Sequence, residues 1–109
     1  MNITLRYVGG DAESVLSYAP SPRIACVMLF SQEKTQRAEA DHARMTQALI
    51  DRVLDLGGTY YLPYRPHATR EQFRRAYPNA EKFVEEKKFY DPDLVFRNGF
   101  WDRYLADMA

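Results

Sequence analysis

The sequence predicts an α+β fold, and three stretches of the chain carry this prediction. Residues 2–8 alternate between apolar and polar side chains, which is the period of a half-buried strand. Residues 24–30 form an unbroken apolar run rich in strand formers, typical of a central strand covered on both faces. Between about residues 31 and 56, apolar residues recur at spacings of three and four, as in a long amphipathic helix. We therefore expect an antiparallel sheet of three or four strands with the long helix on one face, close to half of a ferredoxin-like fold, followed by short C-terminal helices.

An irregular connection is expected between the first two strands. The first strand ends at Gly9-Gly10-Asp11, which we interpret as a turn, because no helix with the spacing of a phosphate-binding loop follows. Residues 14–19 predict a weak strand or an irregular segment. Pro20-Ser21-Pro22 then forms a stiff connector into the apolar run. After the long helix, Gly57 supplies the C-terminal stop.

The middle of the chain predicts a strand, an elbow and a helix. Residues 59–62 form the strand. Pro63 and Pro66 then keep the elbow extended, because each proline fixes its own φ and moves the preceding residue out of the α region. Thr69 and Gln72 have the spacing of a capping box, so the helix is expected to begin there. The apolar side of this helix consists of Phe73, Ala76 and Tyr77.

The C-terminal third predicts a second short helix and an aromatic tail. Asn79 can cap the helix, with Ala80, Phe83 and Val84 directed inward. Asp91-Pro92-Asp93 is a turn signal, residues 94–96 form a short extended piece, and from about Asn98 the chain can form one or two helical turns. Chain ends are normally polar and frayed. Because residues 91–109 are so rich in aromatic side chains, we expect this tail to dock on another surface.

The composition excludes several classes of protein. A chain of 109 residues has the size of a single domain or domain fragment, residues 1–109. Its 15 basic and 15 acidic residues are interspersed, so no field attracts nucleic acid or a membrane surface. Cys26 is the only cysteine, which excludes an intramolecular disulfide and a Cys-based zinc site. Because the longest apolar run is too short to span a bilayer, we expect a soluble protein, and the unpaired cysteine is typical of a reducing cytoplasm.

The elbow is the candidate catalytic site. Tyr61, Tyr64, Arg65 and His67 gather where the predicted strand ends. A phenol can exchange a proton with a substrate hydroxyl, Arg65 can hold an anionic or polar group through its fork, and His67 can donate or accept a proton. The residues alone leave another interpretation open, in which the tyrosines are core residues with satisfied hydroxyls and Arg65 is an ordinary ion-pair partner.

No other group in the sequence indicates catalysis or metal binding. His42 lies on the apolar stripe of the long helix, and we interpret it as a packed residue at a helix–sheet boundary and expect no metal site. The charged residues around it indicate a solvated face: Arg37, Glu39, Asp41 and Arg44. The chain has no Ser/His/Asp set, HExxH motif, P-loop or dinucleotide fingerprint. We therefore expect the chain to be catalytically incomplete alone.

Residues from about 56 to 105 resemble a known family. The resemblance lies in GGTYYLPYRPHATREQFRRAYP and in EKFVEEKKFYDPDLVFRNGFWDRYL. Its most specific pieces are GG-x-Y-Y-L before the capped T-x-E-x-F helix, and D-P-x-x-x-F-x-N before an aromatic helix. These segments are similar to the C-terminal end of FAD-linked oxidases of the vanillyl-alcohol-oxidase type, which include aldonolactone, alditol and decaprenylphosphoryl-ribose oxidases. The opening NITLRYVGGD is similar to a strand of their substrate (cap) domain.

The resemblance implies a function and a partner. In this family a separate N-terminal domain binds FAD, the cap sheet lies over the isoalloxazine, and the tail returns to the FAD domain. The chain would be the C-terminal substrate domain, and an alcohol-type small molecule (a sugar, alditol or lactone-like compound) would lose a hydride to flavin N5.

The resemblance also assigns residues. Tyr61 corresponds to a pocket tyrosine of the ribose oxidases, whereas Tyr64 stands where they have a lysine near flavin N5. Either Arg65 or His67 compensates for the missing charge, or the reaction and substrate differ. Arg97 and Asn98 match the motif at the return of the tail, and we expect them, with Tyr64, to contact the cofactor. Asp91-Pro92 belongs to the same motif; its simpler role, like that of residues 96–98, is a turn and a domain contact.

Two expectations concern assembly. A sheet face and an aromatic tail without their FAD-binding domain should drive self-association, as a symmetric homodimer. The second hypothesis for the whole chain is a stand-alone α+β binding or dimerisation module without redox activity.

Overall fold

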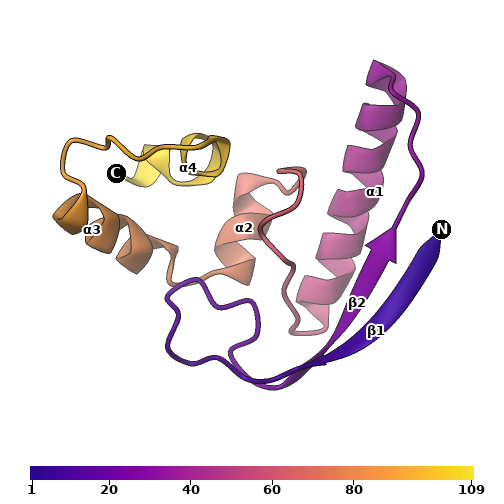
Figure 1. The fold of residues 1–109 in the computed structure, drawn as a ribbon, viewed down its shortest axis with the longest axis horizontal. Helices are drawn as coiled ribbons and strands as arrows, with labels where there is room; N and C mark the ends of the chain where they lie inside the picture. Colours follow the sequence, from indigo (N-terminus) through magenta and orange to yellow (C-terminus); the bar gives the residue numbers. More distant parts are fainter.

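The computed structural model describes residues 1–109, the whole chain, and confirms the α+β class. The molecule is a slab of 42 × 35 × 21 Å. Figure 1 shows a hairpin and the long helix at one end and the shorter helices at the other. In chain order the elements are β1 Asn2–Val8, β2 Arg23–Leu29, α1 Gln36–Asp55, α2 Arg70–Ala76, α3 Ala80–Tyr90, α4 Gly99–Tyr104 and a 3₁₀ turn, η1 Ala106–Met108. None of the helices combines the length and apolar content needed to cross a lipid bilayer.

The sheet has two antiparallel strands, where three or four were expected. The register pairs Asn2 with Leu29 and Val8 with Arg23. Apolar and polar side chains alternate along β1 as predicted. The three apolar residues of β1 lie on the same face of the sheet as the β2 residues with which they pair. We call this the apolar sheet face; it consists of Ile3, Leu5, Tyr7, Ile24, Cys26 and Met28.

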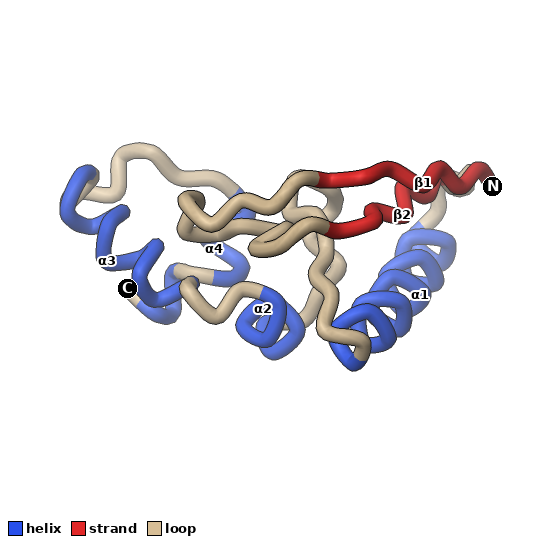
Figure 2. Tube along the Cα trace, turned by 90° about the horizontal axis from the view of Figure 1, so that it is seen from below, coloured by secondary structure: helices blue, strands red, loops and turns tan.

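The apolar sheet face is open to solvent. Leu5 is 69% exposed and Tyr7 is 73% exposed. Figure 2 shows α1 along the opposite face of the hairpin, where Ala25 and Val27 are half-buried. The prediction that residues 24–30 are covered on both faces is therefore wrong. An apolar run shows that a strand is built to be covered, but it does not show that the covering element belongs to the same chain.

Two predicted strands are irregular segments. Residues 59–62 pair with no strand. The Thr59 hydroxyl donates to the carbonyl of Tyr18, and the Tyr77 hydroxyl donates to the carbonyl of Tyr60. Residues 14–19 form turns, closed by a bond from the Asp11 amide to the Ala19 carbonyl at 2.8 Å. Both segments are thus tied to the rest of the chain by single hydrogen bonds and not by a ladder.

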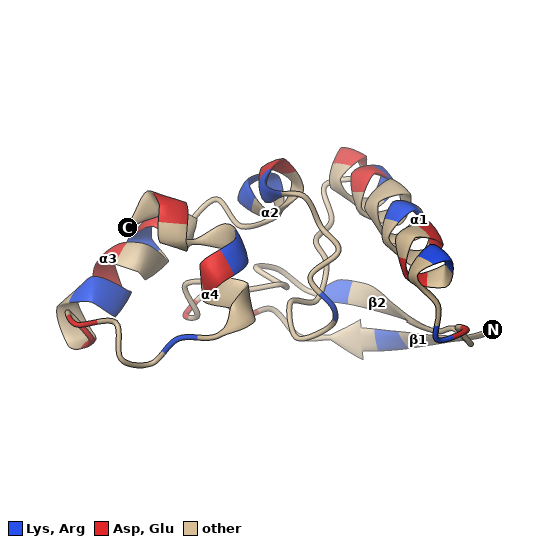
Figure 3. Cartoon of the chain, turned by 90° about the horizontal axis from the view of Figure 1, so that it is seen from above, with Lys and Arg blue, Asp and Glu red and all other residues tan.

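The long helix α1 begins at a cap and ends at a glycine. The Thr35 hydroxyl accepts the amide of Ala38 at 3.1 Å, so the helix begins five residues later than the apolar spacing suggested. Gly57 adopts a φ of +74° just beyond the last turn, as expected for a C-terminal stop. Figure 3 shows that acidic and basic residues are interspersed along α1.

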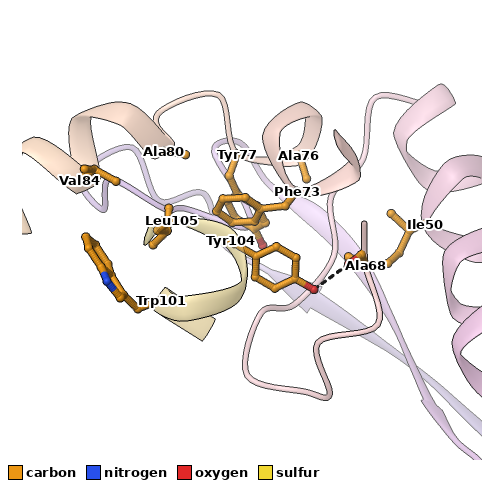
Figure 4. Packing of buried hydrophobic residues seen from close by; sticks show 10 residues of the cluster. All are labelled: Ile50, Ala68, Phe73, Ala76, Tyr77, Ala80, Val84, Trp101, Tyr104 and Leu105. Atoms are coloured by element: carbon orange, nitrogen blue, oxygen red, sulfur yellow. Dashed lines mark hydrogen bonds between the residues drawn. The ribbon is translucent and has the colours of Figure 1, made fainter. Parts of the chain in front are cut away.

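The main core lies among α2, α3 and α4 and away from the sheet. The Phe73 ring is stacked on Tyr77 at 5.6 Å and on Tyr104 at 5.0 Å between centroids. Figure 4 shows these rings with Leu105 and Trp101 beside them. The predicted capping box is present, since Thr69 and Gln72 bond each other's backbone amides at 3.1 and 3.0 Å. The α2 and α3 residues predicted to face inward are buried or half-buried: Phe73, Ala76, Tyr77, Ala80, Phe83 and Val84.

The aromatic tail packs inside this core. Trp101, Tyr104 and Leu105 are buried, and the Tyr104 hydroxyl donates to the Ala68 carbonyl at 2.8 Å. These side chains therefore have their partner within the chain. The part of the tail that remains exposed and apolar is Val95 and Phe96. Asn79 is at the N-cap position of α3 as predicted, but its side chain makes no capping bond.

Candidate functional site

The elbow between α1 and α2 is held against α1 by its backbone. The amide of His67 donates to the carbonyl of Arg65 at 2.8 Å, which makes a tight turn around Pro66. The Gln47 side chain on α1 donates to the His67 carbonyl at 2.8 Å. Pro63 and Pro66 carry no N–H, so no helical turn forms here. The elbow therefore presents its side chains from a fixed backbone.

Tyr61 and Tyr64 lie together on the surface. Their rings meet edge to face at 5.4 Å between centroids, and Tyr18 contacts Tyr61 in the same manner at 5.0 Å. Tyr61 is 47% exposed and Tyr64 is 68% exposed. No group in the chain bonds the hydroxyl of either residue, so both phenols are free to bind another molecule. The three rings form an exposed aromatic cluster, which could stack on a planar or sugar-like ligand.

Arg65 and His67 meet at a different partner, Glu39 on α1. The Arg65 Nη1 donates to Glu39 Oε2 at 2.5 Å, and His67 Nε2 lies 2.7 Å from Glu39 Oε1. Gln32 donates to Glu39 Oε2 at 2.8 Å and accepts from Arg65 at 3.2 Å. The His67 side chain is buried, whereas that of Arg65 is exposed. One carboxylate thus orients a cation and an imidazole.

Glu39 is a strong acceptor in this arrangement. The hydrogen bond from Gln32, the bond to His67 and the nearby charge of Arg65 lower the pKa of Glu39 to about 2. An ionised carboxylate has no proton to donate, so in the hydrogen bond between Glu39 and His67 the proton is on Nε2 of His67. In the neutral ring the acceptor lone pair is then on Nδ1. This is the relation by which a carboxylate sets the tautomer of a general base.

A cavity of about 500 Å³ lies between the first half of α1, the elbow and α4. Glu39, Arg65, His67 and Arg103 supply its charged and titratable side chains. Tyr61 and Tyr64 are absent from its lining. The structure thus brings the four predicted site residues together as two pairs: the two tyrosines with Tyr18, and Arg65 and His67 with Glu39.

Sequence reasoning missed Glu39. From the sequence, this residue belongs to a solvated face; that prediction holds for Asp41 and Arg44, which form an exposed ion pair. Glu39 precedes His42 by three residues, so it borders the apolar stripe of α1 instead of lying opposite to it. The spacing of Glu39 and His42 therefore indicates that Glu39 could contact another segment. Which residues it contacts depends on where the elbow folds.

His42 packs as predicted, and the chain offers no metal cluster. Its ring lies 5.6 Å from Phe30 and 5.3 Å from His67 between centroids. No group of three or more His, Cys, Asp and Glu side chains is arranged to hold a metal ion.

Arg97 and Asn98 are both engaged within the tail. Arg97 binds Asp102 through Nε at 3.0 Å and Nη2 at 2.5 Å. The Asn98 side chain accepts the Trp101 amide at 2.9 Å and so caps α4. Nearby, the side chain of Lys87 donates to Asp91, and the amides of residues 95 and 96 donate to the same carboxylate; these bonds lower the pKa of Asp91. The motif at the return of the tail therefore forms a turn and a cap.

Comparison with known protein families, with curated proteins and with solved structures finds no match to this chain.

Proposed function

We propose that this chain is the C-terminal substrate domain of an FAD-dependent oxidoreductase acting on an alcohol-type small molecule. In that reaction the substrate carbon would lose a hydride to flavin N5 while its hydroxyl would lose a proton to a base of this chain, so that a carbonyl would form. FAD supplies the redox chemistry when bound. The observation that carries the proposal is the apolar sheet face, which a self-contained domain would bury.

An incomplete sheet supports a missing partner domain. The apolar face and the outer edges of β1 and β2 are unpaired within the chain. Free edges and open apolar faces are features that folded proteins normally cover. We infer that further strands from an FAD-binding partner complete a sheet of three or four strands, close to half of a ferredoxin-like fold. A cytoplasmic location is part of this proposal.

The chain offers two groups of residues for such a reaction. The free phenols of Tyr61 and Tyr64 would bind the substrate and the flavin ring edge. His67, with its tautomer set by Glu39, would hold the proton of the substrate hydroxyl. Arg65, which binds the same carboxylate, would supply the positive charge. Of the three expected cofactor contacts, only Tyr64 has a side chain without a hydrogen-bond partner in the chain, so it is the residue that fits the flavin best.

The stand-alone module is the second candidate, because the same open face and edges would also serve an interface between copies. The transcript that encodes Met1 separates the two. A reading frame that continues upstream into an FAD-binding domain supports the oxidoreductase. A stop codon immediately upstream, with no FAD-binding domain encoded beside it, supports the module.

Equilibrium dialysis of the 109-residue chain with FAD gives a second test. We expect weak or undetectable binding, because flavin affinity depends on a pyrophosphate cradle that the sequence lacks. Micromolar binding of FAD by this chain would contradict the assignment of FAD binding to a separate domain. In the complete enzyme, Tyr64→Phe and Arg65→Ala should slow flavin reduction with little change in stability, whereas purely structural roles predict the reverse.

A further inference from the structure

We propose that the cavity between α1, the elbow and α4 binds a small molecule through a carboxylate or phosphate group, and that Arg103 is the residue that binds this anion. The proposal goes beyond the redox function, because it involves no flavin and concerns residues of this chain alone. It rests on the charge state of the cavity and on the position of Arg103.

The two arginines that line the cavity differ in their partners. Arg65 is neutralised by Glu39 at 2.5 Å. Arg103 forms no ion pair with any carboxylate; within the chain its side chain donates one hydrogen bond, a long one of 3.4 Å to the Ala68 carbonyl. A guanidinium has five N–H donors in a fixed fork. Most of the donors of Arg103 are therefore available to a ligand.

Arg103 is also positioned by its surroundings. Its guanidinium lies 5.5 Å from the centroid of the buried Tyr104 ring, and its own carbonyl accepts a bond from Arg70 Nε at 2.7 Å. The Tyr104 hydroxyl and the Arg103 side chain both donate to the carbonyl of Ala68, at the end of the elbow. An arginine held in this way loses less conformational entropy when it binds an anion.

The charges around the cavity favour an anion. Arg65 and Arg103 outnumber the single carboxylate, Glu39, and the other lining residues besides His67 are uncharged: Gln36, Ala40, Ala43 and Pro66. The cavity offers about 500 Å³ and is largely open to solvent, so a small molecule can enter it freely. The guanidinium fork matches the two oxygens of a carboxylate or phosphate, and the oxygen acceptors of such a group would satisfy the free donors of Arg103.

The test is a titration of the flavin-free chain followed by NMR of arginine side chains. Sodium phosphate and sodium acetate are the two probes, and sodium chloride at the same ionic strength is the control. We expect saturable shifts of the Arg103 Nε–Hε signal and of the His67 amide with at least one probe. Binding of one probe alone would identify the site as a phosphate or a carboxylate site.

Three variants distinguish a site from general attraction. Arg103→Gln should weaken binding by about tenfold or more, equivalent to about 1.4 kcal/mol per factor of ten. Arg52→Gln is the matched control, because Arg52 is an exposed arginine of α1 without a carboxylate partner and lies outside the cavity lining. Glu39→Gln should strengthen binding, since it removes the one negative charge of the lining and frees Arg65.

Several outcomes would overturn the proposal. The first is that the NMR signals of all arginines shift equally with the probe. The second is that Arg103→Gln and Arg52→Gln weaken anion binding equally, and the third is that Glu39→Gln does not strengthen it. If circular dichroism shows that Arg103→Gln is unfolded, Arg65→Gln takes its place: it removes the other cation of the lining and should weaken binding, whereas Glu39→Gln should strengthen it. Effects in the same direction would overturn the proposal. The result does not depend on the redox function, which the transcript and the FAD dialysis test separately.

Discussion

Glu39 and His67 are 28 residues apart in the chain, and their side chains meet at 2.7 Å. This contact and the bond from Gln47 to the His67 carbonyl hold the elbow against α1. The hydrogen bond from Gln32, together with the contact to His67, lowers the pKa of Glu39 to about 2.

The first prediction concerns the pH dependence of stability. The pKa of Glu39 is lowered from 4.5 to about 2 on folding, so its ionised form stabilises the folded state. This contribution is complete above pH 4.5 and is lost as the pH falls toward 2. Urea midpoints measured across this window should fall less steeply for Glu39→Gln than for the wild type. Equal slopes would contradict the contact, because the lowered pKa values of Asp11 and Asp91 are common to both proteins.

The second prediction concerns the cap of α4. Asn98→Ala should lower the free energy of unfolding by about 0.5–2 kcal/mol, because the Trp101 amide loses its acceptor. Asn79→Ala is the control: Asn79 occupies the same position at α3, makes no capping bond, and should have a smaller effect. Denaturant unfolding of the isolated chain measures both. A role of Asn98 only in cofactor binding would leave the stability of this chain unchanged.

The third prediction tests whether the tail packs within the chain. Leu105 is fully buried, so Leu105→Ala should cost about 2–5 kcal/mol of unfolding free energy. Phe96 is 80% exposed, and Phe96→Ala should change the stability by less than about 0.5 kcal/mol. Thermal or urea denaturation compares the two. Similar small effects at both positions would show that the tail needs another domain to become ordered.

The fourth prediction concerns the apolar sheet face. In solution the chain should self-associate, with a dimer as the principal species in light scattering, because this face is exposed on both strands. Leu5→Glu places a charge on the apolar face and should give a monomer. Thr4→Glu places the same charge on the opposite face of β1 and should leave the dimer intact. A wild-type monomer at high concentration would refute the prediction.

Much of the local structure could be predicted because its causes are local. The Thr69–Gln72 capping box, the stripe of α1, the stop at Gly57 and the elbow between two prolines each depend on residues within a turn or two of one another. Alternation in β1 was likewise readable, since neighbouring side chains of any strand point to opposite faces. These features follow from backbone sterics and from short-range hydrogen bonds.

From the sequence, the residues of the candidate site in the elbow could be predicted, but their contacts could not. The sequence placed Tyr61, Tyr64, Arg65 and His67 close together, but the structure divides them between an aromatic cluster and a carboxylate. Which pair a side chain joins depends on where α1 lies, and α1 ends before the elbow begins. Glu39 was missed for the same reason.

The α+β class, the short C-terminal helices, the Thr69–Gln72 capping box and the apolar character of the two strands follow from local sequence patterns alone. That the sheet has two strands, that the tail packs on α2 and α3, and that Glu39 binds His67 depend on the folded arrangement. The physical reason is that a hydrophobic pattern or a polar group specifies the kind of partner it needs, while the identity of that partner depends on competition among all segments of the folded chain. The Tyr60 carbonyl illustrates this, because it accepts the Tyr77 hydroxyl and not a neighbouring strand.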